Sequence, residues 1–381
     1  MEKSINSFLK FRKQQGLLRS LKTLIPLEFG RVQYRKKIYE NFSSNDYLGL
    51  ASHSYLKKSA KESLKVNVAS SASRLMTGST IMHENLEKKI ARFKGKEAAL
   101  VFNSGYQANV GILSACLSSK DAVFSDRLNH ASIVDGIMLS GAKIYRFKHN
   151  DMEHLEKLLK KHRKKYKNAM IVTETVFSMD GDICPVNEII NLKKKYNCML
   201  MVDEAHATGI FGKNGSGIVG EKNVAGDVDI IMGTFSKAMG GFGAYAATNK
   251  TMKKYLVNVC RSFIYSTSLP PSIIAINSAA IDVVKNEPFR REHLLENSEY
   301  LRKKLKSIGC RVLGQSQIIP IIIGDNNKVL ELSRYLHGKN FWVTPVRPPT
   351  VPSGTARLRL SVTCDHSRLV LDRLVEAVND F

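Results

Sequence analysis

The sequence predicts an α/β fold in which helices flank a mostly parallel sheet, and three observations support this prediction. Through the middle of the chain, short apolar runs alternate with amphipathic stretches, which is the pattern of strand–helix repeats. From about residue 286 the texture changes, because the charged helical stretch 289–309 precedes one more apolar run. A chain of 381 residues also exceeds the usual size of one domain, so we expect a second, smaller domain.

The apolar runs that should form buried strands are short and end in polar residues. They are Ala98–Phe102, Met170–Thr173, Met199–Val202, Asp229–Met232 and, in the smaller domain, Ile318–Ile323. Met152–Lys161 and Val186–Tyr196 have the pattern of helices, and residues 1–40 are expected to form a helix and a short strand. The predicted domains are an N-terminal arm (1–45) packed on the small domain, a large domain (46–285) and a small C-terminal domain (286–381).

Composition excludes several classes of protein. No stretch reaches the roughly 18 apolar residues that span a bilayer, and the first residues lack the apolar segment of a secretory signal. The six cysteines are dispersed without a CxxC pair, which favours a cytoplasmic protein over a disulfide framework or a metal site. The net charge of +24 is spread along the chain without interleaved aromatic residues, which favours a generally lysine-rich composition over nucleic-acid binding. Such a basic surface would still attract an anionic substrate or an acidic carrier protein.

Polar residues follow each predicted strand of the large domain. Ligands gather at the carboxyl ends of strands in parallel α/β sheets, so these residues should lie close together. The turn after the first strand also precedes a helical run, where free N–H groups can bind an anion. In chain order the residues are Ser104, Gly105, Tyr106, Glu174, Ser178, Asp203, Glu204, His206, Thr234, Ser236 and Lys237.

This set of groups predicts a pyridoxal phosphate (PLP) site. Asp203 would hold the pyridine nitrogen protonated, so that the ring can accept electrons. Lys237 would carry the cofactor as a Schiff base, and the glycines at 240–243 would let the loop pass close to it. Taken singly, such an aspartate is usually a helix cap and such a lysine a solvated loop residue. The combination, with each residue ending an apolar strand, favours the cofactor site.

These residues lie in motifs that resemble the α-oxoamine synthases, a family within the class II PLP-dependent aminotransferase superfamily. Its members join an amino acid to an acyl thioester with loss of CO2. The resemblance runs from about Asn41 to His366 and implies fold type I, with a mostly parallel seven-stranded sheet flanked by helices and a smaller α+β C-terminal domain. It rests on NFSSNDYLGL (41–50), SRLMTGSTIMHENLEKKIA (73–91), DRLNHASIVDG (126–136), TETVFSMDGD (173–182), MVDEAHATGIFG (201–212) and GTFSKAMGGFG (233–243).

The resemblance assigns catalytic roles to four residues. Lys237 would be the Schiff-base lysine and general base, and Asp203 would pair with the pyridine nitrogen. His206 would hydrogen-bond the phenolic oxygen of the ring, and His130 would stack on the ring face and later act as an acid. The residues near the phosphate or beside the cofactor would be Ser104, Gly105, Tyr106, Ser178, Thr234 and Ser236.

The resemblance also implies homodimers with shared sites, in which Thr267 reaches the phosphate of the neighbouring subunit. The implied substrate contacts are Arg19, Asn45, Arg347, Thr350 and Arg359. For the carboxylate of the amino acid, Arg359 is the better candidate and Arg347 its rival. One departure concerns the loop before Arg74: where the family has a glycine-rich run, this chain has Ala69-Ser70-Ser71-Ala72-Ser73, and serine tolerates a positive φ less well than glycine.

Three segments indicate the substrates. They resemble the family member that condenses L-alanine with a pimeloyl thioester, on CoA or on an acyl carrier protein, in biotin synthesis. Sibling enzymes that use glycine with acetyl-CoA or succinyl-CoA, or serine with palmitoyl-CoA, share the cofactor motifs and remain alternatives. A non-catalytic nucleic-acid-binding protein is a remote one. The segments are RFKHNDMEHLEKLL (146–159), FIYSTSLPP (263–271) and RPPTVPSGTARLRLSVT (347–363).

Overall fold

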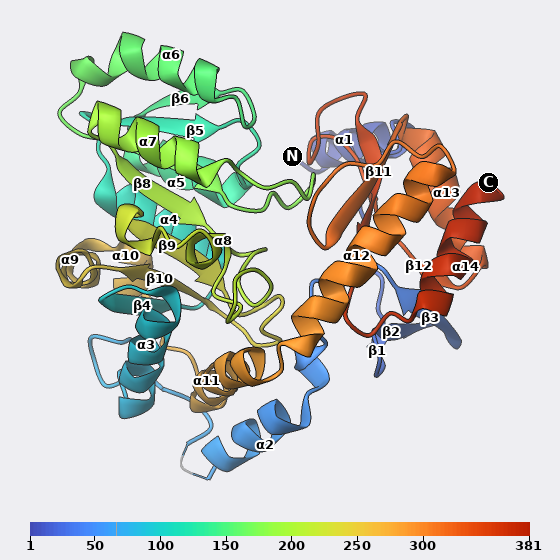
Figure 1. The fold of residues 1–381 in the computed structure, drawn as a ribbon, viewed down its shortest axis with the longest axis horizontal. Helices are drawn as coiled ribbons and strands as arrows, with labels where there is room; N and C mark the ends of the chain where they lie inside the picture. Colours follow the sequence, from blue (N-terminus) through green and yellow to red (C-terminus); the bar gives the residue numbers. More distant parts are fainter. Residues whose placement is uncertain (66) are drawn as a thin grey trace. The chain divides into compact units, whose positions relative to one another are not determined.

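The computed structural model describes residues 1–65 and 67–381 and divides the chain into two compact units (Figure 1). The large unit contains Leu50–Phe177 and Ile183–Arg291. The small unit contains Met1–Gly49, Glu292–Phe381 and, in addition, the short segment Ser178–Asp182 from the middle of the chain. The main boundaries therefore lie at 49/50 and 291/292, where the sequence analysis placed them at 45/46 and 285/286.

A seven-stranded sheet forms the centre of the large unit, in the order β4-β10-β9-β8-β7-β5-β6. All strands run in the same direction except β10, which pairs antiparallel with both β4 and β9. The predicted α/β fold with a mostly parallel seven-stranded sheet is thus confirmed. The strands are β4 (Ala98–Phe102), β5 (Ala122–Asp126), β6 (Lys143–Phe147), β7 (Ala169–Glu174), β8 (Met199–Asp203), β9 (Ile230–Thr234) and β10 (Ala244–Thr248).

Helices cover this sheet because its strands are apolar on both faces. Alternate residues of the strands, such as Met170 and Val172, pack against α4, α5, α9 and α10 in one apolar core. The predicted helix Val186–Tyr196 coincides with α7, and Met152–Lys161 ends one residue before α6 does. The helices of this unit are α2 (Ser54–Ser63), α3 (Ile81–Lys94), α4 (Gly105–Cys116), α5 (Ala131–Ser140), α6 (Met152–His162), α7 (Val186–Tyr196), α8 (Ile218–Glu221), α9 (Lys250–Val259), α10 (Arg261–Ile264) and α11 (Pro271–Asn286).

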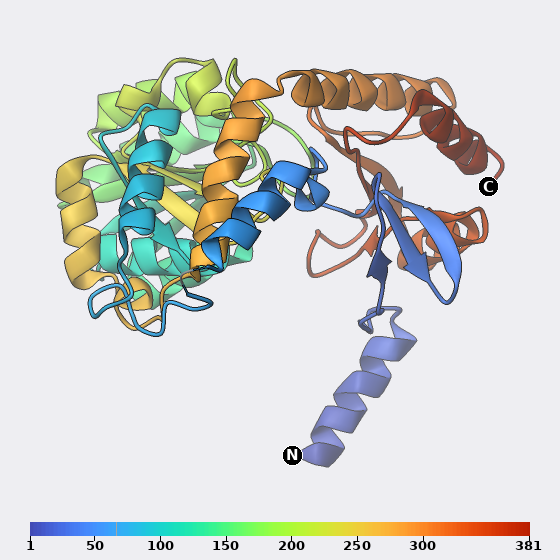
Figure 2. The same cartoon turned by 90° about the horizontal axis from the view of Figure 1, so that it is seen from below.

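The small unit is α+β, as predicted, and is built around two small sheets with the strand orders β1-β2-β3-β12 and β11-β14-β13. Figure 2 shows α1 extending away from these sheets, and the helix buries none of its residues. The elements are α1 (Glu2–Gln14), β1 (Ile25–Pro26), β2 (Arg31–Tyr34), β3 (Lys37–Asn41), α12 (Phe289–Ser307, which begins in the large unit), β11 (Ile318–Gly324), α13 (Asn326–Gly338), β12 (Phe341–Trp342), β13 (Pro345–Val346), β14 (Ala356–Ser361) and α14 (Arg368–Asn379).

The first 41 residues differ from the prediction, because three short strands follow the helix where one was expected. Strands β2 and β3 form a hairpin whose two-residue turn, Arg35-Lys36, has φ values of 47° and 67°. Glycine or asparagine usually occupies such a turn, so arginine and lysine gave no turn signal in the sequence. Among residues 1–65 and 67–381 no helix is long and apolar enough to cross a membrane.

The segment Ser178–Asp182 is held in the small unit by several hydrogen bonds. The carbonyl of Gly181 accepts bonds from the Gln315 N–H (2.9 Å) and the Ser316 hydroxyl (2.8 Å). The carboxylate of Asp180 pairs with Arg357 on β14. Gly181 has a φ of 67°, and a Cβ atom there would lie 2.2 Å from the carbonyl oxygen of Ile318. Only glycine fits this position without moving the backbone.

Replacing Gly181 by alanine should therefore destabilise the protein by more than about 2 kcal/mol, because strain at a positive φ adds to the clash with Ile318. Urea unfolding of the cofactor-free protein measures this loss. Gly226→Ala is the matched control, since a Cβ atom at Gly226 would meet nothing within 4 Å. Equal midpoints for the two variants would contradict the packing described for Gly181.

Candidate active site

The turn that leads from β4 into α4 lies against the carboxyl end of β9 at the predicted anion site. Ser104 caps helix α4, and its hydroxyl accepts the Gln107 N–H at 3.1 Å. A Cβ atom on Gly105 would lie 2.8 Å from Thr234 Cγ2, so the first residue of α4 lies close against the last residue of β9. The hydroxyl oxygen of Thr234 is buried and has no hydrogen-bond partner among the described residues. A helix N-terminus, a glycine and an unsatisfied hydroxyl together suit a phosphate group.

Asp203, at the end of β8, presents a buried carboxylate to the same edge of the sheet. Its Oδ1 accepts the Ala205 N–H at 2.8 Å, and its Oδ2 accepts the side-chain amide of Asn109 at 2.9 Å. Asn109 lies on α4, and the sequence analysis did not find it. In the sequence, Asn109 is marked only as a polar residue within the apolar helical stretch that follows Ser104-Gly105. His206, three residues after Asp203, is also buried.

His130 follows β5 and caps helix α5, where its Nδ1 accepts the Ser132 N–H at 3.2 Å. Partial burial lowers the pKa of His130; the negative charge of Asp203 opposes this shift, and the positive charge of Lys237 adds to it. The structure thus brings both the carboxylate of Asp203 and the ammonium group of Lys237 within electrostatic range of the His130 imidazole. These are three of the four residues predicted to be catalytic.

Lys237 lies in a tight loop after β9. The Gly240 N–H donates to the Lys237 carbonyl (2.9 Å), and the Gly241 N–H donates to the Phe235 carbonyl (2.8 Å). Gly240 has a φ of 61°, and a Cβ atom there would come within 2.4 Å of the carbonyl carbon of Leu50. The glycines therefore let the loop fold back on itself and hold Lys237 half-buried. Ser236 is exposed beside it.

A buried ion pair forms at Glu204, the residue that follows Asp203, and its cation could not be predicted from the sequence. Lys94, the last residue of α3, pairs with Glu204 at 2.7 Å, and both side chains are inaccessible to solvent. Lys94 also donates to Thr208, and Glu204 accepts the Val219 N–H at 2.9 Å. Burial alone would lower the pKa of Lys94, but Glu204 and Tyr245 raise it above its usual value. The pair fixes the turn that carries Asp203 and His206.

Other predicted cofactor residues lie on the surface of the large unit. The hydroxyl of Tyr106 donates to Asp135, and this hydrogen bond raises the pKa of Tyr106. Thr267 is exposed, and its carbonyl accepts a bond from the side chain of Asn103 at 2.8 Å. Neither side chain contacts the Asp203 network through any described hydrogen bond.

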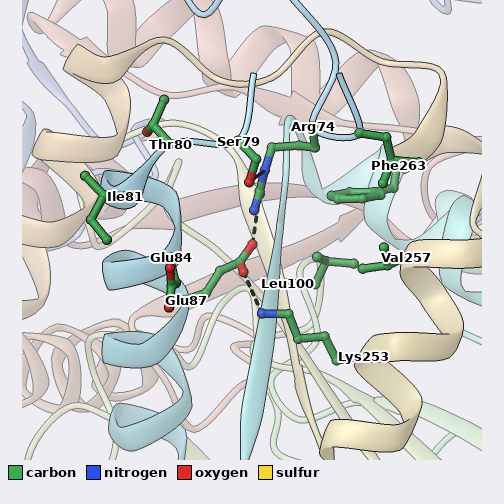
Figure 3. A pocket seen from close by; sticks show the side chains of 11 residues that line it. Arg74, Ser79, Thr80, Ile81, Glu84, Glu87, Leu100, Lys253, Val257 and Phe263 are labelled. Atoms are coloured by element: carbon green, nitrogen blue, oxygen red, sulfur yellow. Dashed lines mark hydrogen bonds and ion pairs between the residues drawn. The ribbon is translucent and has the colours of Figure 1, made fainter. Parts of the chain in front are cut away.

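A pocket of about 380 Å³ in the large unit is lined by other residues than Ser104, His130, Asp203 and Lys237 (Figure 3). At its floor the buried Glu87 bridges Arg74 (2.8 Å) and Lys253 (2.6 Å). Leu100, Val257 and Phe263 form part of its wall. None of the predicted site residues lines this pocket, so it has no place in the predicted site.

In the small unit, Arg359 is buried among neutral groups. It donates to the Ser178 carbonyl (2.6 Å), the Ser361 hydroxyl (2.6 Å), the Asn45 side chain (3.3 Å) and the Tyr47 hydroxyl (3.2 Å). No carboxylate among the described residues pairs with it, whereas its neighbour Arg357 pairs with Asp180. Three predicted residues, Asn45, Ser178 and Arg359, thus lie together around one uncompensated guanidinium.

The other three predicted substrate residues line a second place in the small unit, a cavity of about 980 Å³. Arg19 donates to the Thr350 hydroxyl at 2.8 Å, and Arg347 donates to the Gly16 carbonyl. Burial lowers the pKa of Arg347, and the charges of Arg19 and Arg12 lower it further. The cations that line the cavity, with no acidic residue among the lining, are Lys13, Arg19, Lys22, Arg334 and Arg347.

The buried ion pair yields a stability prediction. Lys94→Met should cost about 3–5 kcal/mol of unfolding free energy, because it leaves the Glu204 carboxylate buried without a counter-charge. Adding Glu204→Leu should recover much of this loss. Lys89→Met is the matched control on α3, since its ion pair with Asp282 is partly exposed and should cost less than about 1 kcal/mol. Urea unfolding of the cofactor-free protein checks all three; a double variant as unstable as Lys94→Met would contradict the account.

Comparison with known proteins identifies the family. The model of the aminotransferase class I and II family matches residues 37–378. An 8-amino-7-oxononanoate synthase of Geobacter sulfurreducens is 45% identical over 99% of this chain and 97% of its own length. A variant of serine palmitoyltransferase from S. paucimobilis, solved with a bound PLP–myriocin aldimine, has a TM-score of 0.92 and 29% identity, over 99% of this chain and 96% of its own.

A solved 8-amino-7-oxononanoate synthase from Francisella tularensis has a TM-score of 0.79 and 28% identity, over 89% of this chain and 96% of its own. Both named activities are those of α-oxoamine synthases, so the resemblance found in the sequence motifs is confirmed. The chain belongs to the class I and II aminotransferase family, in its α-oxoamine synthase branch.

Proposed function

We propose that the chain catalyses the PLP-dependent condensation of L-alanine with a pimeloyl thioester, with loss of CO2, which is the reaction of 8-amino-7-oxononanoate synthases in biotin biosynthesis. The observation that carries the chemistry is the grouping of Lys237, Asp203 and His130 at the carboxyl edge of the sheet. The choice of substrates is supported by the 45% identity, over nearly the whole chain, to a synthase of that name.

The large unit has the groups that PLP requires. Bound PLP supplies an electron sink for the bond that breaks at the amino acid's Cα atom. We propose that Lys237 would hold the cofactor covalently through Nζ until the amine of the amino acid displaces it, and that the freed Nζ would then accept the Cα proton. Asp203 would keep a proton on the pyridine nitrogen, and His206 would donate a hydrogen bond to the phenolic oxygen. His130 would stack on the ring face and would donate a proton in the later step.

The phosphate group of the cofactor is proposed to bind at the N-terminus of α4. The N–H groups of Gly105 and Tyr106 are among the first of the helix, which have no partners within it. The unsatisfied hydroxyl of Thr234 lies against Gly105, and Ser236 follows two residues later. Ser178 is assigned a place beside the ring on family likeness.

The carboxylate of L-alanine is assigned to Arg359. Its guanidinium is buried and held by neutral acceptors, so its charge is available for an anionic ligand. Asn45 lines the same place. Arg347, the rival, lies in the cationic cavity together with Arg19 and Thr350. We assign these three to the acyl donor, whose carboxylate and carrier group are anionic both on CoA and on a carrier protein.

A homodimer with shared sites accounts for Thr267 and for the apolar surface around it. Thr267 forms an isolated bridge with Ser73, so the loops 73–79 and 263–271 lie side by side. Several large apolar residues on these loops are exposed, among them Leu75, Met76 and Tyr265. A second copy that covers them would explain their exposure, and the proposed role of Thr267 is to reach that copy's phosphate group.

Incubation of the PLP-loaded protein with L-alanine and each thioester tests the proposed reaction. With pimeloyl-CoA or the pimeloyl carrier protein, mass spectrometry should detect 8-amino-7-oxononanoate. Lys237→Ala should give none and should lose the covalent link to the cofactor. Serine with palmitoyl-CoA is the necessary comparison, given the structural likeness to serine palmitoyltransferase. Faster turnover of that pair, or of glycine with acetyl-CoA or succinyl-CoA, would contradict the choice of substrates.

Substitution of the two arginines tests the assignment of the carboxylate. Arg359→Ala should raise the KM for L-alanine about 30–100-fold, because a charge-assisted hydrogen bond contributes about 2–3 kcal/mol. Arg359→Lys, which keeps the charge, should lose less. Arg347→Ala should leave the KM for alanine within about threefold and raise that of the thioester instead. The reverse pattern in steady-state kinetics would assign the amino acid to Arg347.

A further inference from the structure

A chain of hydrogen bonds joins Asp203 to His130 through two side chains to which no role has been assigned so far. The amide nitrogen of Asn109 lies 2.9 Å from Asp203 Oδ2 and 2.9 Å from the Ser132 hydroxyl. The Ser132 hydroxyl in turn lies 2.8 Å from His130 Nδ1. Asn109, Ser132 and Asp203 are all buried, so water does not compete for these contacts.

The chemistry of the groups fixes the direction of every bond in this chain. A carboxylate only accepts, so the Asn109 group that faces Asp203 is the NH2 group, and its second hydrogen points to Ser132. The Ser132 oxygen therefore accepts from Asn109 and can donate its own proton to His130 Nδ1. The Ser132 N–H also points at Nδ1, at 3.2 Å. With two donors directed at it, Nδ1 of the neutral ring is an acceptor, and the ring proton lies on Nε2.

Two features indicate that this chain is more than packing. A Cβ atom at Gly136 of α5 would lie 2.9 Å from the Asn109 carbonyl oxygen and 3.0 Å from Val110 Cα, so the close approach of α4 and α5 at this level requires glycine. The side-chain oxygen of Asn109 is buried without a partner among the described residues. An unsatisfied buried oxygen costs stability, which an apolar residue at this position would avoid.

We propose that Asn109 and Ser132 are positioning residues that hold His130 in the tautomer with its proton on Nε2 and tie the orientation of its ring to Asp203. Nε2 makes no hydrogen bond to any described residue, so its proton is available to a ligand. The charged groups near the ring are Asp203, Asp135 and Lys237. The inference rests on the proposed function for its consequence, since His130 is the proposed proton donor.

The tautomer can be measured without any substrate. In protein labelled with 15N-histidine, long-range 1H–15N spectra at pH 8 should give His130 an unprotonated Nδ1 and a protonated Nε2, both without cofactor and with PLP. Loss of the signal in His130→Gln assigns it. A protonated Nδ1 in the wild-type protein would overturn the proposal outright.

Variants test whether the hydrogen-bond chain sets the tautomer. In Ser132→Ala the 15N chemical shift of His130 Nδ1 should move toward the value for a mixture of the two tautomers. The kcat should fall about tenfold or more, while the KM for alanine stays within about threefold of the wild-type value. Ser132→Thr keeps the hydroxyl and should restore both. Ser140→Ala is the matched control, because within residues 1–65 and 67–381 this hydroxyl on α5 bonds only to Ile137 and Ala142. Equal kcat and spectra for Ser132→Ala and Ser140→Ala would refute the proposal.

The double variant tests whether the two residues act as one unit. Asn109→Ala should change kcat and the His130 spectrum in the same direction as Ser132→Ala, and the double variant should lose no more than the larger single loss. Additive losses would mean separate roles and would overturn the chain. If Asn109→Ala does not fold, the wild-type spectrum and the Ser132 variants still test which tautomer His130 adopts and whether Ser132 sets it. If no thioester yields a product with alanine, the proposed function fails while the spectra still judge the tautomer.

Discussion

Two adjacent carboxylates, Asp203 and Glu204, are buried where β8 ends, and both must be stabilised without water. An unpaired buried charge costs several kcal/mol, so each carboxylate requires its own partner. The carboxylate of Glu204 forms an ion pair with the ammonium group of Lys94 on α3, which neutralises its charge within the protein. The carboxylate of Asp203 accepts hydrogen bonds from the Asn109 amide and the Ala205 N–H. These bonds orient the carboxylate, but neither donor is a cation, so they do not neutralise its charge. Glu204 thus holds the turn through its ion pair, and Asp203 keeps the negative charge that we propose pairs with the ring nitrogen of the cofactor.

Much of this arrangement could be predicted because chemistry concentrates where buried strands end. Ser104, Asp203 and Lys237 each follow an apolar run, and parallel strands bring such ends to one edge of the sheet. Lys94 and Asn109 could not be found in this way. Each lies within a helix, and its partner, Glu204 or Asp203, is about 100 residues away along the chain. No local pattern marks a polar residue whose partner is supplied only by the fold.

The cations of the small unit illustrate the same limit. The sequence motifs could name Arg359 and Arg347 as rivals, because both lie in one segment of basic and apolar residues. The fold separates them: Arg359 has neutral acceptors and a buried position on β14, whereas Arg347 lines a cavity with four other cations. Ser71 is a related case. This chain has serine and alanine in the loop where the family has glycine. In the structure Ser71 has a φ of 60°, a conformation that glycine adopts more easily.

The segment Ser178–Asp182 belongs to the small unit, although the residues on either side of it belong to the large one. The two units are therefore not interchangeable modules. A chimera that exchanged only the N-terminal and C-terminal parts would leave Asp180 and Gly181 facing a foreign β11 and β14. Recombination between relatives of this chain should succeed only when Ser178–Asp182 is exchanged together with the rest of the small unit. The inheritance of this short segment is therefore coupled to that of Met1–Gly49 and Glu292–Phe381.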